Sequence, residues 1–206
     1  MSKLAPAAQD ARDRILEAAC ELIAEEGIDE VRIARVAMRA GASTALVHHY
    51  FSTREELLEQ ALLHSFELAA DERFGDEPAE ERTATRGLAR MIEECLPTSG
   101  SAERDWVLWV ELWLRAVRDP SLRPVAAQLY DRYRRWLASG ISAGVESGEF
   151  RECDADAVAD HAMALLDGFG IRAMLGDPSM DAARARTTIA RLLASELGVD
   201  AKELEW

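Results

Sequence analysis

The chain has 206 residues, of which 49% are apolar, and 24 basic against 38 acidic side chains give a formal net charge of −14. The apolar share excludes an intrinsically disordered chain, and the length suggests one or two domains with a sizeable core. The acidic total argues against nonspecific nucleic-acid binding over the whole surface. No apolar run reaches the roughly 18 residues of a membrane span, and charges interrupt the N-terminal segment where a signal peptide is apolar. We therefore expect a cytoplasmic protein that does not enter a membrane.

Signatures of catalysis and of metal binding are missing. Cys20, Cys95 and Cys153 are odd in number and far apart, which fits neither a disulfide framework nor a zinc site, so we expect small buried apolar side chains. The sequence has no Gly-rich phosphate loop and no G-x-S-x-G motif, and its histidines do not cluster with the cysteines. We expect no enzymatic activity, no metal and no other cofactor.

Helical periodicity runs through nearly the whole chain, and strand-like alternation is absent. The apolar spacing predicts an all-α fold with about nine helices. They span about residues 8–26, 32–40, 44–50, 53–73, 81–96, 102–118, 122–147, 155–175 and 180–197. Glycines are predicted to end helices at Gly27, Gly41, Gly148 and Gly198. N-cap residues are predicted at Ser43, Thr53, Asp154 and Ser179.

The second and third predicted helices are short and are joined by a turn that contains Gly41. The second helix has a predicted buried stripe of Ile33, Val36, Ala37 and Ala40, and its arginines gather on another side, at Arg32, Arg35 and Arg39. On the third helix, Leu46, Val47 and Tyr50 point one way, and Thr44, Ala45, His48 and His49 point outward. This arrangement reads as a helix-turn-helix whose second helix enters the major groove of DNA.

Two ordinary short helices with a solvated arginine face would give the same periodicity. The window from Val31 to Arg54 contains four arginines and no acid, which favours the DNA-binding interpretation. Arginines and the helix N-terminus would then meet phosphates, while the outward side chains of the third helix would meet base edges.

The first 60 residues resemble the tetracycline-repressor (TetR) family of bacterial transcription regulators. The resemblance is carried by Ile15–Ala19, Gly27, Val36–Ser43, Leu46–Phe51 and Ser52–Leu58, which match the family pattern at fixed spacing over about residues 12–60. It implies a helix-turn-helix DNA-binding domain at residues 8–52 and a larger helical ligand-binding and dimerisation domain at residues 53–200. It also implies that the chain is a DNA-binding regulator, most simply a repressor.

The resemblance implies a recognition helix formed, with its flank, by Ser43, Thr44, Ala45, His48, His49 and Tyr50. Arg54 stands where the family usually has Lys, which keeps the charge for a phosphate contact, and Arg32 stands where a helix-capping Thr is common. Ala42 and Ala45 replace the usual Val and Gly, and His48 replaces the usual Tyr. The expected DNA-binding set is Arg32, Arg35, Ser43, Thr44, Ala45, His48, His49, Tyr50 and Arg54. Tyr50 has a second interpretation, as packing between the third and fourth helices, and Phe51 is better explained by packing than by DNA contact.

An aromatic stripe marks the later part of the chain. Trp106, Trp109 and Trp113 recur at helical spacing, with Val110 and Val117 on the same stripe, and the next helix carries Tyr130, Tyr133 and Trp136. Such a stripe forms either ordinary core or the wall of a ligand pocket. Segments around residues 106–120, 148–151 and 167–169 resemble the family branch that includes the choline-responsive betaine-pathway repressors.

Candidate carboxylates for a ligand site are Glu94, Glu111 and Asp167, and His161 is expected to be a core or pocket histidine. Aromatic faces and carboxylates together favour a cationic effector, whereas a neutral aromatic effector would need only the rings. The expected ligand-binding set is Trp106, Trp109, Trp113, Tyr133, Glu94, His161 and Asp167.

The last two predicted helices carry alanines at Ala155, Ala159, Ala162, Ala183, Ala190 and Ala194, which permit close helix approach. By family analogy these helices form a four-helix bundle in a homodimer. We thus expect a homodimeric regulator that binds a palindromic DNA operator and is released by a small-molecule effector. The alternative is a helical small-molecule-binding protein or enzyme whose helix-turn-helix no longer binds DNA.

Overall fold

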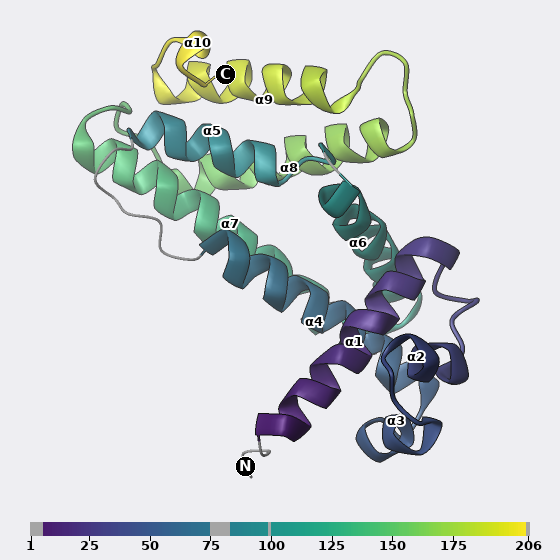
Figure 1. Ribbon diagram of the computed structural model, residues 1–206. Coiled ribbons are helices and arrows are strands. Elements are labelled where there is room, and N and C mark those ends of the chain that lie inside the picture. The colour runs from purple at the N-terminus through teal and green to yellow at the C-terminus, as the bar shows by residue number, and fades with distance from the viewer. Residues whose placement is uncertain (1–5, 75–82, 99, 205–206) are drawn as a thin grey trace. The chain divides into compact units, whose positions relative to one another are not determined.

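The computed structural model describes residues 6–74, 83–98 and 100–204, and over these residues it is helical throughout, with no strand. The first helices are α1 (Pro6–Glu26), α2 (Ile33–Arg39), α3 (Thr44–Tyr50), α4 (Arg54–Phe74), α5 (Ala84–Glu94) and α6 (Gly100–Arg118). The short 3₁₀ helix η2 (Pro120–Leu122) precedes α7 (Arg123–Ser147), α8 (Ala155–Met174), α9 (Ala182–Leu197) and α10 (Ala201–Leu204). The all-α prediction is confirmed (Figure 1).

Most predicted helix ends are found where local chemistry puts them. The Ser43 hydroxyl accepts the Leu46 N–H at 3.1 Å, and Asp154 accepts the Ala157 N–H at 3.1 Å. Gly198 ends α9 in the left-handed conformation, with φ of 74°, which costs glycine little. The predicted start of the fifth helix at residue 81 lies outside the described residues; within them, Thr83 caps α5.

One predicted helix end is wrong, and one short helix was missed. Ser179 is not the cap of α9, because its N–H and its hydroxyl both donate to Asp177, at 2.8 and 2.7 Å. The cap is Asp181, which accepts the Arg184 N–H at 2.7 Å. The one-turn helix α10 was not predicted, since four residues carry too little periodicity to recognise.

The chain divides into two compact units. The first contains the described residues up to Arg73 together with Arg104–Val125, and the second contains the described parts of residues 74–103 and 126–206. In the first unit the apolar face of α1 is buried as predicted, with Ile15, Leu16 and Ile23 fully inaccessible. Cys20 is buried there too, donates to the Ala61 carbonyl, and has its pKa raised to about 12 by burial.

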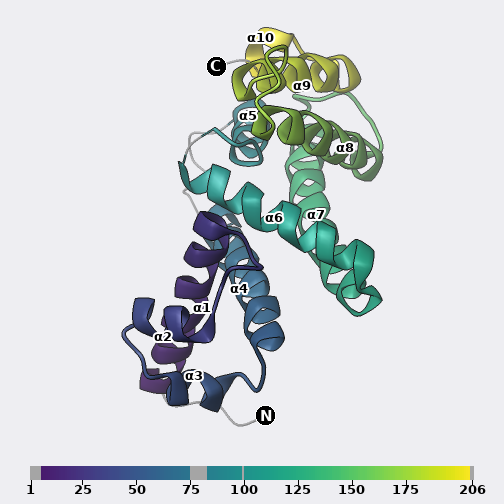
Figure 2. The same ribbon diagram turned by 90° about the vertical axis from the view of Figure 1, so that its right-hand side faces the viewer.

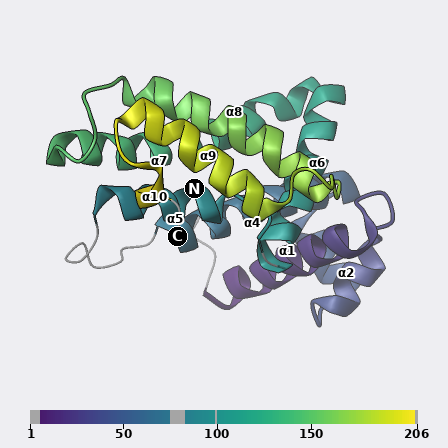
Figure 3. The ribbon, with the colours of Figure 1, turned by 90° about the horizontal axis from the view of Figure 1, so that it is seen from above.

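In the second unit, α9 packs against α8, α5 and α10 (Figures 2 and 3). Its core consists of apolar side chains from α5, α7, α8, α9 and α10, such as Leu88, Ile141 and Ile189. Within the described part of the chain, no helix is long and apolar enough to span a bilayer. Cys95 and Cys153 are only half-buried, unlike the buried side chains expected from the sequence.

Four of the six alanines named on α8 and α9 pack within a single chain. Ala159, Ala162, Ala190 and Ala194 lie in the core of their own chain, each at most 2% exposed. The close approach that these small residues permit is therefore between α8 and α9 of one chain. The outward side of α8 instead presents Ala164 and Gly168, and Leu175 just after the helix is 78% exposed.

Candidate functional site

Two short helices, α2 and α3, pack on each other through their apolar sides in the first unit (Figure 1). Val36, Ala37 and Val47 are at most 2% exposed, so the predicted inner faces are the observed ones. Gly41 lies between the helices with φ of 63°, a left-handed conformation that the tight reversal requires. The geometry is that of a helix-turn-helix, with α3 as its second helix.

The outer face of α3 is open. Thr44, Ala45, His48 and His49 are exposed, as the 100° spacing predicted. Ser43 is exposed as well, but its hydroxyl oxygen caps the helix. Tyr50 is half-buried, and its ring lies 5.2 Å from His49 and 6.3 Å from Phe51 between centroids. Both the packing and the contact interpretation of Tyr50 remain compatible with this position.

The arginines of α2 have acidic partners from α1. Arg35 makes a two-bond ion pair with Glu26. Arg39 donates to Glu25 at 2.7 and 3.0 Å and to Glu21 at 3.0 Å. Residues 31–54 contain no acid, but acids of α1 lie next to their arginines in the folded chain. Arg35 and Arg39 therefore bind α2 to the end of α1.

Arg32 is the exposed arginine at the start of α2. It occupies the N-cap position without making a side-chain cap, and its Nη1 donates to the Asp29 carbonyl at 2.6 Å. Arg54 is different, because its guanidinium is turned toward the protein: it donates to the carbonyls of Val31, Ile28 and Asp29.

Phe51 anchors the end of α3. Its side chain is 1% exposed, and the Arg12 guanidinium lies 5.7 Å above its ring. Arg12 also donates to Gln60 of α4 at 3.0 Å. The packing role expected for Phe51 agrees with this burial.

The three tryptophans of α6 lie in the first unit and contact one another. Ring centroids are 6.2 Å apart for Trp106 and Trp113, and 5.6 Å apart for Trp109 and Trp113. Trp106 and Trp109 are 6% and 8% exposed, which favours the core interpretation of the stripe. Val117 does not continue the stripe, since it is 74% exposed at the end of α6.

The remaining ligand candidates lie in the second unit. Two of them, Asp167 and Tyr133, each contact an aromatic residue of α7. Asp167 of α8 accepts the Tyr130 hydroxyl of α7 at 2.7 Å. Burial raises the pKa of Asp167 to about 6, although the Tyr130 bond opposes that rise. Tyr133 is buried, with its ring 6.4 Å from that of Trp136 in an edge-to-face arrangement. Tyr130 was recognised from the sequence as one of the aromatic residues of this helix, but it was not included in the expected ligand-binding set.

Two other candidates are in different surroundings. Glu94 forms an ion pair with Arg90 one turn earlier on α5, at 2.5 Å. His161 is not a core or pocket histidine in the single chain: its side chain is 60% exposed and bonds to Glu196 at 2.9 Å, which raises its pKa. An outward position on α8 explains this, because the apolar neighbours in sequence belong to the opposite face.

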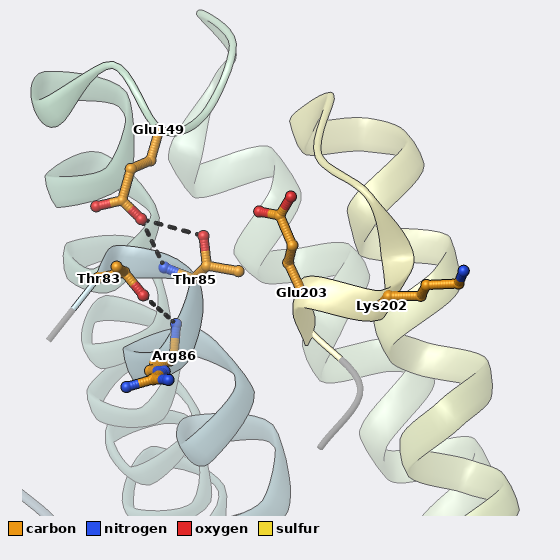
Figure 4. A pocket seen from close by; sticks show the side chains of 6 residues that line it. All are labelled: Thr83, Thr85, Arg86, Glu149, Lys202 and Glu203. Carbon is orange, nitrogen blue, oxygen red and sulfur yellow. Dashed lines mark hydrogen bonds between the residues drawn. The ribbon is translucent and has the colours of Figure 1, made fainter.

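A cavity of about 530 Å³ lies at the N-terminus of α5 (Figure 4). It is lined by Thr83, Thr85, Arg86, Glu149, Lys202 and Glu203. The Glu149 carboxylate accepts the N–H groups of Ala84 and Thr85 and the Thr85 hydroxyl, and these bonds lower its pKa. This carboxylate thus completes the capping of α5.

The fold and the open face of α3 define the class: a helix-turn-helix protein with a separate helical unit of the kind that accompanies transcriptional regulators. Residues 15–61 match the family model of bacterial regulatory proteins of the tetR family, and residues 84–198 match that of the BetI-type transcriptional repressor C-terminal domain. The chain belongs to the TetR family of transcriptional regulators and carries a C-terminal domain of the BetI type.

Individual relatives agree. The HTH-type transcriptional regulator BetI of Brucella abortus is 28% identical over 187 residues, which cover 90% of this chain and 91% of that protein. A transcriptional regulator from Saccharomonospora viridis, solved in complex with choline, is 33% identical, with a TM-score of 0.79 over 90% of this chain and 96% of its own. A TetR-family regulator from Rhodococcus sp. is 26% identical, with a TM-score of 0.77 over 92% and 99%.

These relatives are transcriptional regulators rather than enzymes. Among the described residues, no group of three or more His, Cys, Asp or Glu side chains could hold a metal ion.

Proposed function

We propose that the protein is a cytoplasmic homodimeric repressor that binds a palindromic operator and is released from it by a small cationic effector of the choline type. The observation that carries the effector class is the half-buried Asp167 carboxylate of α8, which accepts the hydroxyl of the aromatic residue Tyr130 of α7. At neutral pH this carboxylate is mostly ionised, because its pKa is about 6.

DNA contact is assigned to the outer face of α3. Thr44, Ala45, His48 and His49 are exposed and small or polar, which suits base edges in the major groove. Ser43 and Tyr50 flank this face, and Arg32 supplies a phosphate contact at the start of α2. Arg35 was expected to contact DNA, but its two-bond pair with Glu26 supports a role in holding α2 against α1.

Effector binding is assigned to the second unit. A carboxylate and aromatic rings attract a quaternary ammonium ion more strongly when water is excluded. Tyr133 and Trp136 belong to the same unit and pack edge to face. The S. viridis regulator, similar over nearly its whole length, was solved with choline, which supports the same chemical class here. Trp106, Trp109 and Trp113 remain candidates only if the stripe is pocket rather than core.

Dimerisation is assigned to the outward sides of α8 and α9. Ala164 and Gly168 leave room for a partner helix, and Leu192 of α9 is 44% exposed. In a homodimer a two-fold axis would bring the same two helices of both chains together, which matches a palindromic operator.

A single titration series tests this proposal. DNA duplexes selected by the protein from a random library are titrated with and without choline, with a neutral aromatic compound as the competing effector. We expect a palindromic preference, steep salt dependence and loss of binding on adding choline. Release by the neutral compound alone would favour an effector site that needs only rings. Absence of DNA binding at low salt would favour a ligand-binding protein whose helix-turn-helix is no longer used.

A further inference from the structure

The guanidinium of Arg54 is committed to the backbone of another segment. Arg54 is the first residue of α4, and residues 27–32 connect α1 to α2. Its Nε donates to the Val31 carbonyl at 2.7 Å, and its Nη2 donates to the carbonyls of Ile28 at 2.6 Å and Asp29 at 3.1 Å. The remaining nitrogen, Nη1, lies 3.5 Å from Glu55. Every nitrogen of this side chain therefore has a partner within the chain.

These bonds hold the connector, defined as residues 27–32, against the start of α4. Ile28 and Val31 are 4% and 1% exposed, so these two side chains lie in the core while their carbonyls accept from Arg54. Hydrogen bonds from a charged donor are about twice as strong as neutral ones, and a carbonyl that loses its donor while shielded from water is costly. A planar guanidinium reaches several acceptors at fixed angles, whereas a lysine ammonium is a compact point charge and cannot reproduce this fork.

The connector leads directly into α2, so its position sets the start of the helix-turn-helix. Arg35 and Arg39 hold α2 against α1, and Arg12 and Phe51 hold the end of α3. Arg54 adds the link from α4 to the beginning of α2. These three sets of contacts fix α2 and α3 relative to α1 and α4.

We propose that Arg54 is a positioning residue for DNA recognition, which orients α3 through the connector carbonyls rather than by contacting a phosphate. This inference rests on the proposed DNA-binding function. It replaces the phosphate contact that the resemblance implied for this position. It also explains a role for Arg where the family usually has Lys, because the guanidinium reaches the three carbonyls from two separate nitrogens, whereas a lysine ammonium has only one.

The test compares Arg54→Lys, which keeps the charge, with Arg54→Gln, which removes it. Arg135→Lys is the control, at an arginine of α7 that is 67% exposed and has no assigned role in DNA binding. Affinity is measured for a duplex selected by the wild-type protein and for a scrambled duplex of equal length, at several salt concentrations. We expect both Arg54 variants to lose about tenfold in affinity for the selected duplex, because a misplaced α3 would lose about one base contact. Affinity for the scrambled duplex should change little. Arg135→Lys should bind both duplexes as the wild type does.

Amide hydrogen exchange of the DNA-free protein provides a second readout. We expect faster exchange across residues 27–32 in both Arg54 variants, with the overall helix content retained. Wild-type affinity in Arg54→Lys, together with a salt slope reduced by about one in Arg54→Gln on both duplexes, would overturn the proposal in favour of a phosphate contact. Unchanged exchange across residues 27–32 would overturn it independently of DNA. A wild-type protein that prefers no duplex would instead contradict the proposed function, and the exchange measurement would still decide the role of Arg54.

Discussion

The two units of the molecule use their polar side chains for different purposes. In the first unit, Arg35, Arg39 and Arg54 bind acids and carbonyls of neighbouring segments and hold short helices in place. In the second unit, Asp167 is half-buried with a tyrosine hydroxyl as its partner, and burial keeps its pKa high. A rigid scaffold suits the reading of a DNA groove, whereas a partly desolvated carboxylate suits a ligand that carries the opposite charge.

The largest expected effect comes from the anchor of the first unit. Phe51→Ala removes a fully buried ring beneath Arg12, so we expect the first unit to lose about 3–5 kcal/mol of unfolding free energy. DNA binding should be lost with it. Chemical denaturation measures the loss, and Tyr50→Phe, which keeps its ring, is the control. A loss below about 1 kcal/mol would show that Phe51 does not anchor α3.

The effector site of the second unit is tested by Asp167→Asn. The amide can still accept the Tyr130 hydroxyl but carries no charge, so we expect choline affinity to fall by about 2 kcal/mol, the value of a hydrogen bond or contact to a charged group. Calorimetry measures the affinity. Asp160→Asn, at a carboxylate of α8 that is 65% exposed, should leave it unchanged. Equal choline affinity in Asp167→Asn and the wild type would show that the charge of Asp167 does not contribute to effector binding.

The pH dependence of effector binding also tests whether the charge of Asp167 attracts the effector. The pKa of Asp167 is raised to about 6, so the carboxylate is mostly charged above that pH and mostly neutral below it. A bound cation favours the charged form. Choline affinity should therefore be highest above about pH 7 and fall as the pH is lowered through about 6. Calorimetric titrations from pH 5 to 8 test this, and a flat profile, or a rise toward acid, would contradict it.

On the first unit, the outer face of α3 should govern sequence preference. Thr44→Ala and His48→Ala change exposed side chains without touching the core, so we expect discrimination at one base pair to weaken by about 1 kcal/mol or somewhat more. Affinity is measured across a panel of single-base operator variants. An unchanged preference profile for both variants would exclude them from base contact.

The smallest expected effects come from substitutions of two arginines in the predicted DNA-binding set, which should differ in their consequences. Arg32 is exposed at the start of α2, whereas Arg35 is paired with Glu26. Arg32→Ala should weaken binding uniformly across sequences, by less than about 1 kcal/mol, and reduce the salt slope by about one. Arg35→Ala should lower unfolding free energy slightly, with the salt slope retained. A reduced salt slope in Arg35→Ala would show that DNA displaces Glu26.

Much of the helix-turn-helix followed from local patterns. Spacing predicted the buried sides of α2 and α3, the Gly41 reversal and the Ser43 cap, because each depends on residues only a few positions apart. The N-cap of α9 was assigned two residues early, since Ser179 and Asp181 are both good caps and only the turn around Asp177 distinguishes them.

Partners that are distant in sequence were beyond such reasoning. The acids that pair with Arg39 are 14 and 18 residues away, and Asp167 is 37 residues from Tyr130. Helical periodicity predicts which side of a helix is apolar. It does not predict which other helix will supply the partner of a charged side chain. For this reason Arg35, Arg54 and His161 were assigned functional roles from residue type and position, and the structure gave each of them a protein partner.

The sequence by itself determined the all-α class, the nine longer helices and the resemblance of the first 60 residues to a DNA-binding family, because hydrophobic spacing and turn chemistry are local properties. The tertiary structure decided how the charges are used. Ion pairs and hydrogen bonds act over a few ångströms in space, so the roles of Arg54 and Asp167 depended on bringing the connector to α4 and α7 to α8.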